Sequence, residues 1–77
     1  MRVILEPIVV DVCDGSPVVV RWNQSAFQVL HIVDTWTWRG RWWQGDSRRR
    51  YYVLDCVEGT LEVYTDGSAW TLSRLMD

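Results

Sequence analysis

Turn-forming residues interrupt this chain at short intervals, and the segments between them are rich in β-branched and aromatic residues. The turn signals are Asp14-Gly15, Asn23-Gln24-Ser25, Glu58-Gly59 and Asp66-Gly67. Aspartate followed by glycine tolerates positive φ angles, and Asp66-Gly67 is the strongest hairpin signal in the chain. No 3.6-residue apolar period is sustained, so no helix is expected. This pattern predicts an all-β protein.

Six segments are predicted as strands, namely residues 3–12, 18–22, 27–38, 50–57, 61–65 and 69–75. Pro7 implies that the first strand is an edge strand, or is bulged or broken. In the third strand, simple alternation places Phe27, Val29, His31 and Val33 on one face and Gln28, Leu30, Ile32 and Asp34 on the other. Apolar residues on both faces favour a central or bent strand. Five or six short strands at this spacing predict a small antiparallel barrel or a strongly bent sheet.

The length of 77 residues corresponds to a single domain, spanning residues 1–77. A chain of this size buries only about 60% of the surface that its unfolded form exposes, so its core must be economical. Ten aromatic residues, six of them tryptophan, meet this need because each buries about 150–250 Å². An open sheet would leave edges prone to aggregation, so we expect either closure or a homodimer.

The two cysteines, Cys13 and Cys56, lie far apart and lack a CxxC spacing. Secreted domains of this size usually carry more cysteines, and no signal peptide is recognisable, so we expect a cytoplasmic protein. We expect two buried free thiols, with a disulfide as the alternative. With one histidine, these residues make a poor metal site, and no cofactor is expected. No apolar segment approaches the roughly 20 residues of a membrane span.

Charge is distributed unevenly along the chain. Eight arginines face ten acidic residues for a net charge of −2, which argues against broad attraction to nucleic acid. Residues 36–52 nevertheless contain five of the arginines, Asp46 as their single acid, and four of the six tryptophans. The rest of the chain is net negative. A function that depends on positive charge is therefore confined to this one segment.

The candidate binding residues in this segment are Arg39, Arg41, Trp42, Trp43, Arg48, Arg49, Arg50 and Tyr51. Aromatic faces stack on the bases of single strands, and arginines follow the phosphates, so one interpretation is contact with single-stranded or distorted nucleic acid. A second is a protein-interaction adaptor or self-associating module, because Trp, Tyr and Arg also dominate protein interfaces. A third is structural, with tryptophan filling a small core and arginine stacking on it.

No constellation of residues indicates catalysis. His31 stands alone in an apolar strand and is expected to be a packed or hydrogen-bonded core residue. The acids Asp34, Asp55, Glu58, Glu62 and Asp66 form no pair with obvious acid–base geometry. Phosphate-binding glycine loops, nucleophile elbows and zinc-protease motifs are absent from the sequence. We therefore expect a protein without catalytic residues, which acts by binding.

The aromatic and arginine residues follow a pattern that covers most of the chain from Pro17 onward. They are Arg21-Trp22-Asn23, Phe27-x-Val29, Trp36, Trp42-Trp43, Arg50-Tyr51-Tyr52-Val53-Leu54, Leu61-Glu62-Val63-Tyr64-x-Asp66, Trp70-x-Leu72 and Arg74-Leu75-Met76-Asp77. This arrangement resembles a small bacterial family of unknown function. It is also similar to the C-terminal region of ImuB-type proteins, inactive relatives of Y-family translesion polymerases. The resemblance implies a bacterial cytosolic setting, a DNA-repair protein as a partner, and a link to DNA damage tolerance.

Overall fold

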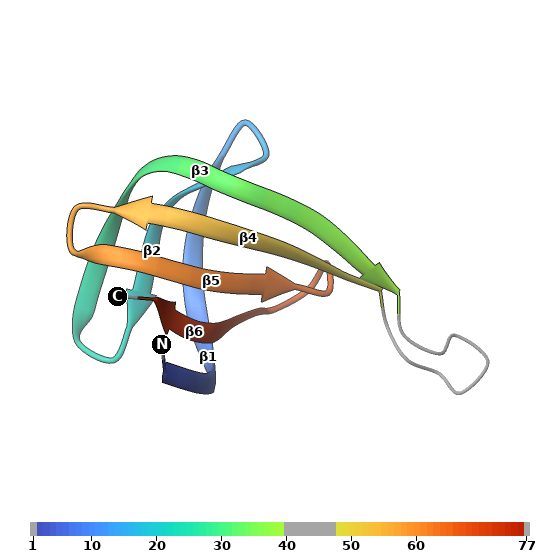
Figure 1. The fold of residues 1–77 in the computed structure, drawn as a ribbon. Helices are drawn as coiled ribbons and strands as arrows, with labels where there is room; N and C mark the ends of the chain where they lie inside the picture. Colours follow the sequence, from blue (N-terminus) through green and yellow to red (C-terminus); the bar gives the residue numbers. More distant parts are fainter. Residues whose placement is uncertain (1, 40–47, 77) are drawn as a thin grey trace.

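The structure, a computed structural model, describes residues 2–39 and 48–76. These residues form six antiparallel strands and no helix: β1 (Arg2–Cys13), β2 (Ser16–Trp22), β3 (Ser25–Arg39), β4 (Arg48–Cys56), β5 (Gly59–Thr65) and β6 (Trp70–Met76). Each strand pairs with the next one along the chain, and β6 pairs with β1, so the sheet closes into a barrel (Figure 1). The predicted all-β class, with a small antiparallel barrel or strongly bent sheet, is confirmed.

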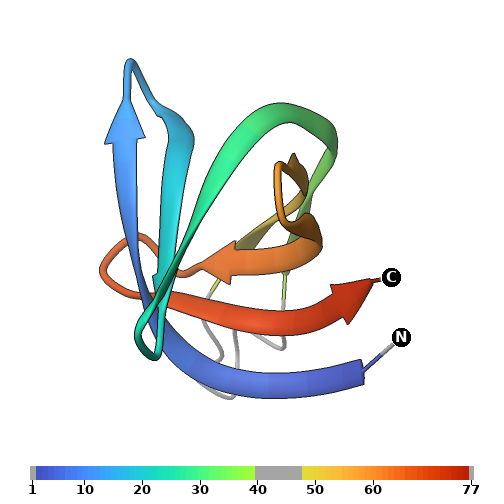
Figure 2. The same ribbon diagram turned by 90° about the vertical axis from the view of Figure 1, so that its left-hand side faces the viewer.

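The long strands β1 and β3 each pair with two different neighbours along their length. Residues 2–8 of β1 pair with β6, whereas residues 9–13 pair with β2. Residues 25–28 of β3 pair with β2, and residues 29–39 pair with β4. Figure 2 shows both strands bending as they pass from one neighbour to the other. Pro7 lies close to a register shift in β1 at which Leu5 adopts a positive φ of 56°, which agrees with the bulge that the proline indicated.

Two bulges in β3 change which of its side chains face inward. The register with β4 shifts between Val29 and His31, and again between Ile32 and Asp34. Each bulge adds a residue that the partner strand does not match, so simple alternation fails beyond the first one. Ile32 consequently packs against the core, whereas the His31 side chain is 64% exposed, with Nε2 3.3 Å from an Asp55 carboxylate oxygen. The predicted shared face of Phe27 and Val29 holds, because both pack against the core, but the predicted faces beyond the first bulge and the core position of His31 were wrong.

The core lies inside the barrel. Its buried cluster receives side chains from β1, β2, β4, β5 and β6, and partly buried residues of β3 pack against that cluster. The buried cluster comprises Ile8, Val20, Tyr52, Leu54, Cys56, Leu61, Val63 and Leu72. Trp22 and Trp70 are only partly buried and pack against this cluster. Aliphatic residues, with Tyr52, therefore fill the centre, and these two tryptophans cover it.

The two cysteines differ in environment and are both free thiols. Cys56 is buried in the core, whereas Cys13 is exposed at the end of β1. Burial, followed by the negative charges of Glu58 and Asp55, raises the pKa of the Cys56 thiol to about 11. The expectation of free thiols is confirmed, but the expectation that both are buried was wrong for Cys13, because it lies beside the β1–β2 turn.

Within the described residues, no helix is long and apolar enough to cross a membrane.

Leu54→Ala tests the core, because the Leu54 side chain is fully buried inside the ring of strands. The substitution should lower the free energy of unfolding by about 2–5 kcal/mol through lost burial and a residual cavity. Leu30→Ala is the matched control, since Leu30 is 59% exposed; its effect should stay within about 0.5 kcal/mol. Urea unfolding followed by far-UV circular dichroism measures both. Equal losses in the two variants would contradict this assignment of the core.

Thiol reactivity should separate the two cysteines, because the thiolate is the reacting form and burial disfavours it at Cys56. At mildly alkaline pH, Ellman's reagent should modify Cys13 rapidly and Cys56 only after denaturation. In Cys13→Ser, the rapid phase should disappear while the slow phase remains. Rapid modification of native Cys13→Ser would show that the Cys56 thiol is accessible.

Candidate functional site

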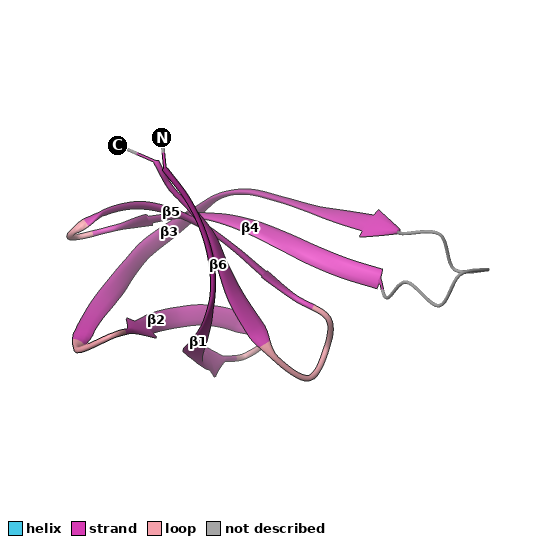
Figure 3. Cartoon of the chain, turned by 90° about the horizontal axis from the view of Figure 1, so that it is seen from below, coloured by secondary structure: helices cyan, strands magenta, loops and turns pink. Residues whose placement is uncertain are grey.

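The distal halves of β3 and β4 form a two-stranded arm that reaches away from the barrel (Figures 1 and 3). In its register, Trp36 lies opposite Tyr51, Thr37 opposite Arg50, Trp38 opposite Arg49, and Arg39 opposite Arg48. Residues directly opposite each other share a face, and successive residues alternate between faces. The arm therefore has an outer face with Trp36, Trp38, Arg49 and Tyr51, and an inner face with Thr37, Arg39, Arg48 and Arg50.

A row of aromatic rings crosses three strands on the outer face. The Trp36 and Tyr51 rings are parallel within 2°, with centroids 5.3 Å apart. The Tyr51 ring lies 5.0 Å from that of Tyr64 on β5, at an interplanar angle of 38°. Tyr64 lies opposite Tyr51 in the β4–β5 register, which places it on the same face. We call Trp36, Trp38, Arg49, Tyr51 and Tyr64 the ring row.

Arg49 contacts two aromatic rings of the ring row, one on β3 and one on β5. Its guanidinium carbon lies 5.3 Å from the Trp38 ring centroid and 4.8 Å from that of Tyr64. Such contacts contribute roughly 0.5–1 kcal/mol each at exposed sites. Arg49 therefore helps to hold these two rings in place and also gives the outer face a positive charge. The structural interpretation of arginine stacked on tryptophan holds for this residue.

Two tryptophans of the ring row keep a substantial surface open to solvent. Trp36 is 40% exposed and Trp38 is 44% exposed. They stand two residues apart on one strand, about 6.6 Å along its axis. Large rings that are ordered by neighbours yet accessible are suited to stacking on a flat partner group.

Charge changes sign along the outer face. Next to the ring row on the barrel side, Asp34 and Glu62 flank Val53 in the strand register. Glu62 is nearly buried, and one of its carboxylate oxygens lies 3.4 Å from Nε of Arg74. Arg49 is the arginine of the ring row itself, whereas Arg39, Arg48 and Arg50 lie on the opposite, inner face. An anionic partner on the outer face would therefore be drawn to Arg49 and away from Asp34.

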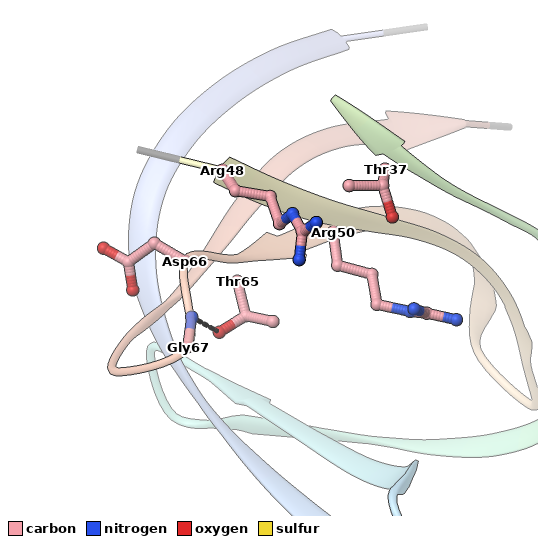
Figure 4. A pocket seen from close by; sticks show the side chains of 6 residues that line it. All are labelled: Thr37, Arg48, Arg50, Thr65, Asp66 and Gly67. Carbon is pink, nitrogen blue, oxygen red and sulfur yellow. Dashed lines mark hydrogen bonds between the residues drawn. The ribbon is translucent and has the colours of Figure 1, made fainter. Parts of the chain in front are cut away.

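The inner face of the arm borders a pocket of about 500 Å³. Its lining residues are Thr37, Arg48, Arg50, Thr65, Asp66 and Gly67 (Figure 4). The Arg50 guanidinium carbon lies 5.8 Å from the Tyr52 ring centroid. The Tyr52 ring in turn contacts Trp70, with centroids 5.5 Å apart. A cationic pocket is thus seated against aromatic residues at the edge of the core.

Residues 66–69 connect β5 to β6, and the first two of them, Asp66 and Gly67, line the pocket. Asp66 Oδ1 accepts hydrogen bonds from the backbone N–H groups of Ser68 and Ala69 and from the Ser68 hydroxyl. The Thr65 hydroxyl accepts from the Gly67 N–H and donates to the Ala69 carbonyl. Asp66-Gly67, the strongest hairpin signal in the sequence, therefore does lie in a turn. That turn is longer than a two-residue hairpin and is closed by the Asp66 and Thr65 side chains.

The predicted binding residues are distributed as follows. Arg39, Arg48 and Arg50 lie on the inner face of the arm, whereas Arg49 and Tyr51 lie on the outer face. Arg41, Trp42 and Trp43 lie outside the described residues. Sequence reasoning omitted Trp36, Trp38 and Tyr64 from the candidate binding residues. The two tryptophans lie in the segment 36–52 that it singled out, whereas the place of Tyr64 beside Tyr51 depends on the register between β4 and β5.

Metal-binding side chains do not gather in the described part of the chain, where no group of three His, Cys, Asp or Glu residues could hold an ion.

In comparisons with known proteins, no family model, curated protein or solved structure matches this chain. The arrangement of the arm and the pocket is therefore the basis for assigning a function.

The Asp66 turn predicts a pH dependence of stability. Hydrogen bonds from Ser68 and Ala69 to the carboxylate hold the pKa of Asp66 below its ordinary value of 3.8. A lowered folded-state pKa means that the contribution to stability is present above pH 3.8 and is lost as the pH falls through the folded value.

Asp66→Asn keeps an oxygen acceptor but cannot titrate. Between neutral pH and about pH 2, the wild type should therefore lose more unfolding free energy than Asp66→Asn. Urea unfolding at a series of pH values measures the difference. Superimposable pH profiles for the two proteins would show that ionisation of Asp66 does not support the turn.

Proposed function

We propose that this protein is a non-catalytic module that binds single-stranded or unpaired nucleic acid on the ring row. Bases stack on Trp36 and Trp38, and Arg49, which contacts the rings of Trp38 and Tyr64, lies close to the backbone phosphates. The observation that carries the proposal is the pair of exposed tryptophans on one face of β3, ordered by Tyr51 and Arg49. Proteins that bind single strands without reading sequence combine such rings with cations.

The electrostatics favour a short, local contact over wrapping of a duplex. The chain has a net charge of −2, and Asp34 and Glu62 border the ring row on the barrel side. Repulsion from these acids opposes a duplex that lies across the whole barrel. A single strand on the ring row meets Arg49 and avoids Asp34 on the barrel side.

The resemblance to the C-terminal region of ImuB-type proteins supports a role in DNA damage tolerance in the bacterial cytoplasm. Gapped and otherwise distorted DNA is the unpaired nucleic acid available in that setting. We therefore include a gapped duplex among the ligands of the test below, beside single strands and an intact duplex.

A protein contact is the second candidate, and the exposed apolar residues of β3 favour it. Leu30 is 59% exposed and Val33 is 58% exposed, and both lie on the same strand as Trp36. An apolar partner surface, including a second copy of this chain, would bury these residues together with the rings. Salt separates the two candidates, because apolar association tolerates salt and phosphate contacts do not.

Binding of a fluorescent oligothymidylate, followed by anisotropy, tests the proposal. Trp38→Ala should weaken binding by about 1–3 kcal/mol, the usual contribution of one base stacked on one ring. Val33→Ala is the control, since it truncates an exposed apolar residue of β3 without removing a ring. Affinity should fall steeply between about 50 and 200 mM salt. The gapped duplex should bind more tightly than the intact one.

Two results would count against the proposal. The first is no binding of any single strand at about 50 mM salt, where phosphate contacts are strong. The second is binding that Trp38→Ala leaves unchanged. Salt-tolerant dimerisation of the wild type in sedimentation experiments, weakened by Val33→Ala, would favour the protein contact instead.

A further inference from the structure

The inner-face pocket holds two guanidiniums that have no partner carboxylate within residues 2–39 and 48–76. Among the described residues, Arg48 and Arg50 make no ion pair or hydrogen bond, and the recorded contact of Arg50 is with the Tyr52 ring. Arg21, by contrast, lies 2.8 Å from Asp11 in an ion pair. No described carboxylate therefore pairs with Arg48 or Arg50, whereas Asp11 pairs with Arg21.

The strand register increases the positive charge at this place. Arg39 lies directly opposite Arg48, so both side chains project from the inner face of the arm. Arg50 follows Arg48 by two residues and shares that face. Like charges directly opposite each other on a sheet are destabilising. A bound anion would relieve this repulsion.

We propose that the pocket formed by Arg48, Arg50 and Thr37 binds the phosphate group of a phosphorylated organic molecule. Guanidinium groups donate forked, charge-assisted hydrogen bonds that match the oxygens of a phosphate. The hydroxyl of Thr37, opposite Arg50 in the register, supplies a third donor on the same face. A volume of about 500 Å³ exceeds what a bare phosphate fills and lies within the range of small-molecule sites.

The remaining lining groups define where the phosphate sits. Asp66 brings a negative charge, but its Oδ1 is engaged by Ser68 and Ala69, and Figure 4 shows its carboxylate directed away from both guanidiniums. The Thr65 hydroxyl donates to the Ala69 carbonyl and the Gly67 N–H donates to Thr65, so neither is a free donor. The phosphate therefore sits beside the arginines, away from the 66–69 turn.

This site goes beyond the proposed function, because it lies on the face of the arm opposite the ring row. The phosphate has two possible sources with the same chemistry. One is a free phosphorylated metabolite such as a mononucleotide, and the other is the terminal phosphate of a nucleic-acid strand. The two faces can be tested separately, since Arg48 and Arg50 are not in the ring row, and Trp38 does not line the pocket.

Titration of ¹⁵N-labelled wild-type protein with inorganic phosphate, and then with thymidine monophosphate, tests the site at constant ionic strength. The Nε–Hε signals of Arg48 and Arg50 should shift in a saturable manner, and that of Arg21 should stay in place. Sodium chloride at matched ionic strength should produce no saturable shift. This measurement needs no variant, so it holds even if a substitution impairs folding.

Variants then assign the binding to the pocket. Arg48→Ala/Arg50→Ala should weaken mononucleotide binding by about tenfold or more, because charge-assisted hydrogen bonds are lost. Arg2→Ala and Arg21→Ala remove exposed arginines that do not line the pocket and should change it by less than about twofold. Unshifted Nε–Hε signals with both ligands, or equal mononucleotide affinity in the double alanine variant, would overturn the proposal.

Oligothymidylates with and without a 5′-phosphate distinguish the two sources. Tighter binding of the phosphorylated strand, lost in Arg48→Ala/Arg50→Ala, would assign the site to a strand end. Saturable shifts with the mononucleotide, without any preference for the phosphorylated strand, would assign it to a free metabolite. The unphosphorylated strand reports on the ring row alone, so failure of the proposed function and failure of this site give different results.

Discussion

Closure of the sheet through β1 and β3 is the constraint on which the rest of the structure depends. Each of these strands pairs with one neighbour along its first part and with another along its second. Bulges let the strands bend between the two sets of partners. The resulting ring encloses a core in which Val20, Leu54 and Val63 have no exposed surface. Closure gives every strand two partners, although β1 and β3 pair on one side only at each point along their length.

The length of β3 and β4 has a second consequence, because their paired ends continue beyond the enclosed core. On the barrel, Tyr52 and Leu54 of β4 belong to the core cluster, and Val53 between them is buried as well. On the arm, both faces are available. Alternation along β4 then divides consecutive arginines, with Arg49 on the aromatic face and Arg48 and Arg50 on the pocket face. One run of basic residues thus produces two surfaces of different chemistry.

The two surfaces also differ in the surroundings of their arginine side chains. On the outer face, Arg49 lies between two rings and helps to order them. On the inner face, Arg48 and Arg50 line an open pocket beside a turn whose own hydrogen bonds engage Asp66 and Thr65. The first arrangement is suited to a flat aromatic partner and the second to a compact anion. Net charge, which is negative for the whole chain, describes neither surface.

The amino-acid sequence by itself determined the strands and their turns, because β-branched segments and residues such as Asp14-Gly15 act locally. Both of those turn residues adopt the positive φ angles that their types favour. It also determined which segment concentrates arginine and tryptophan. Only the tertiary structure decided the faces. The bulges in β3 exposed His31, and the β4–β5 register brought Tyr64 beside Tyr51. Both depend on pairing between distant segments, which alternation along one strand does not specify.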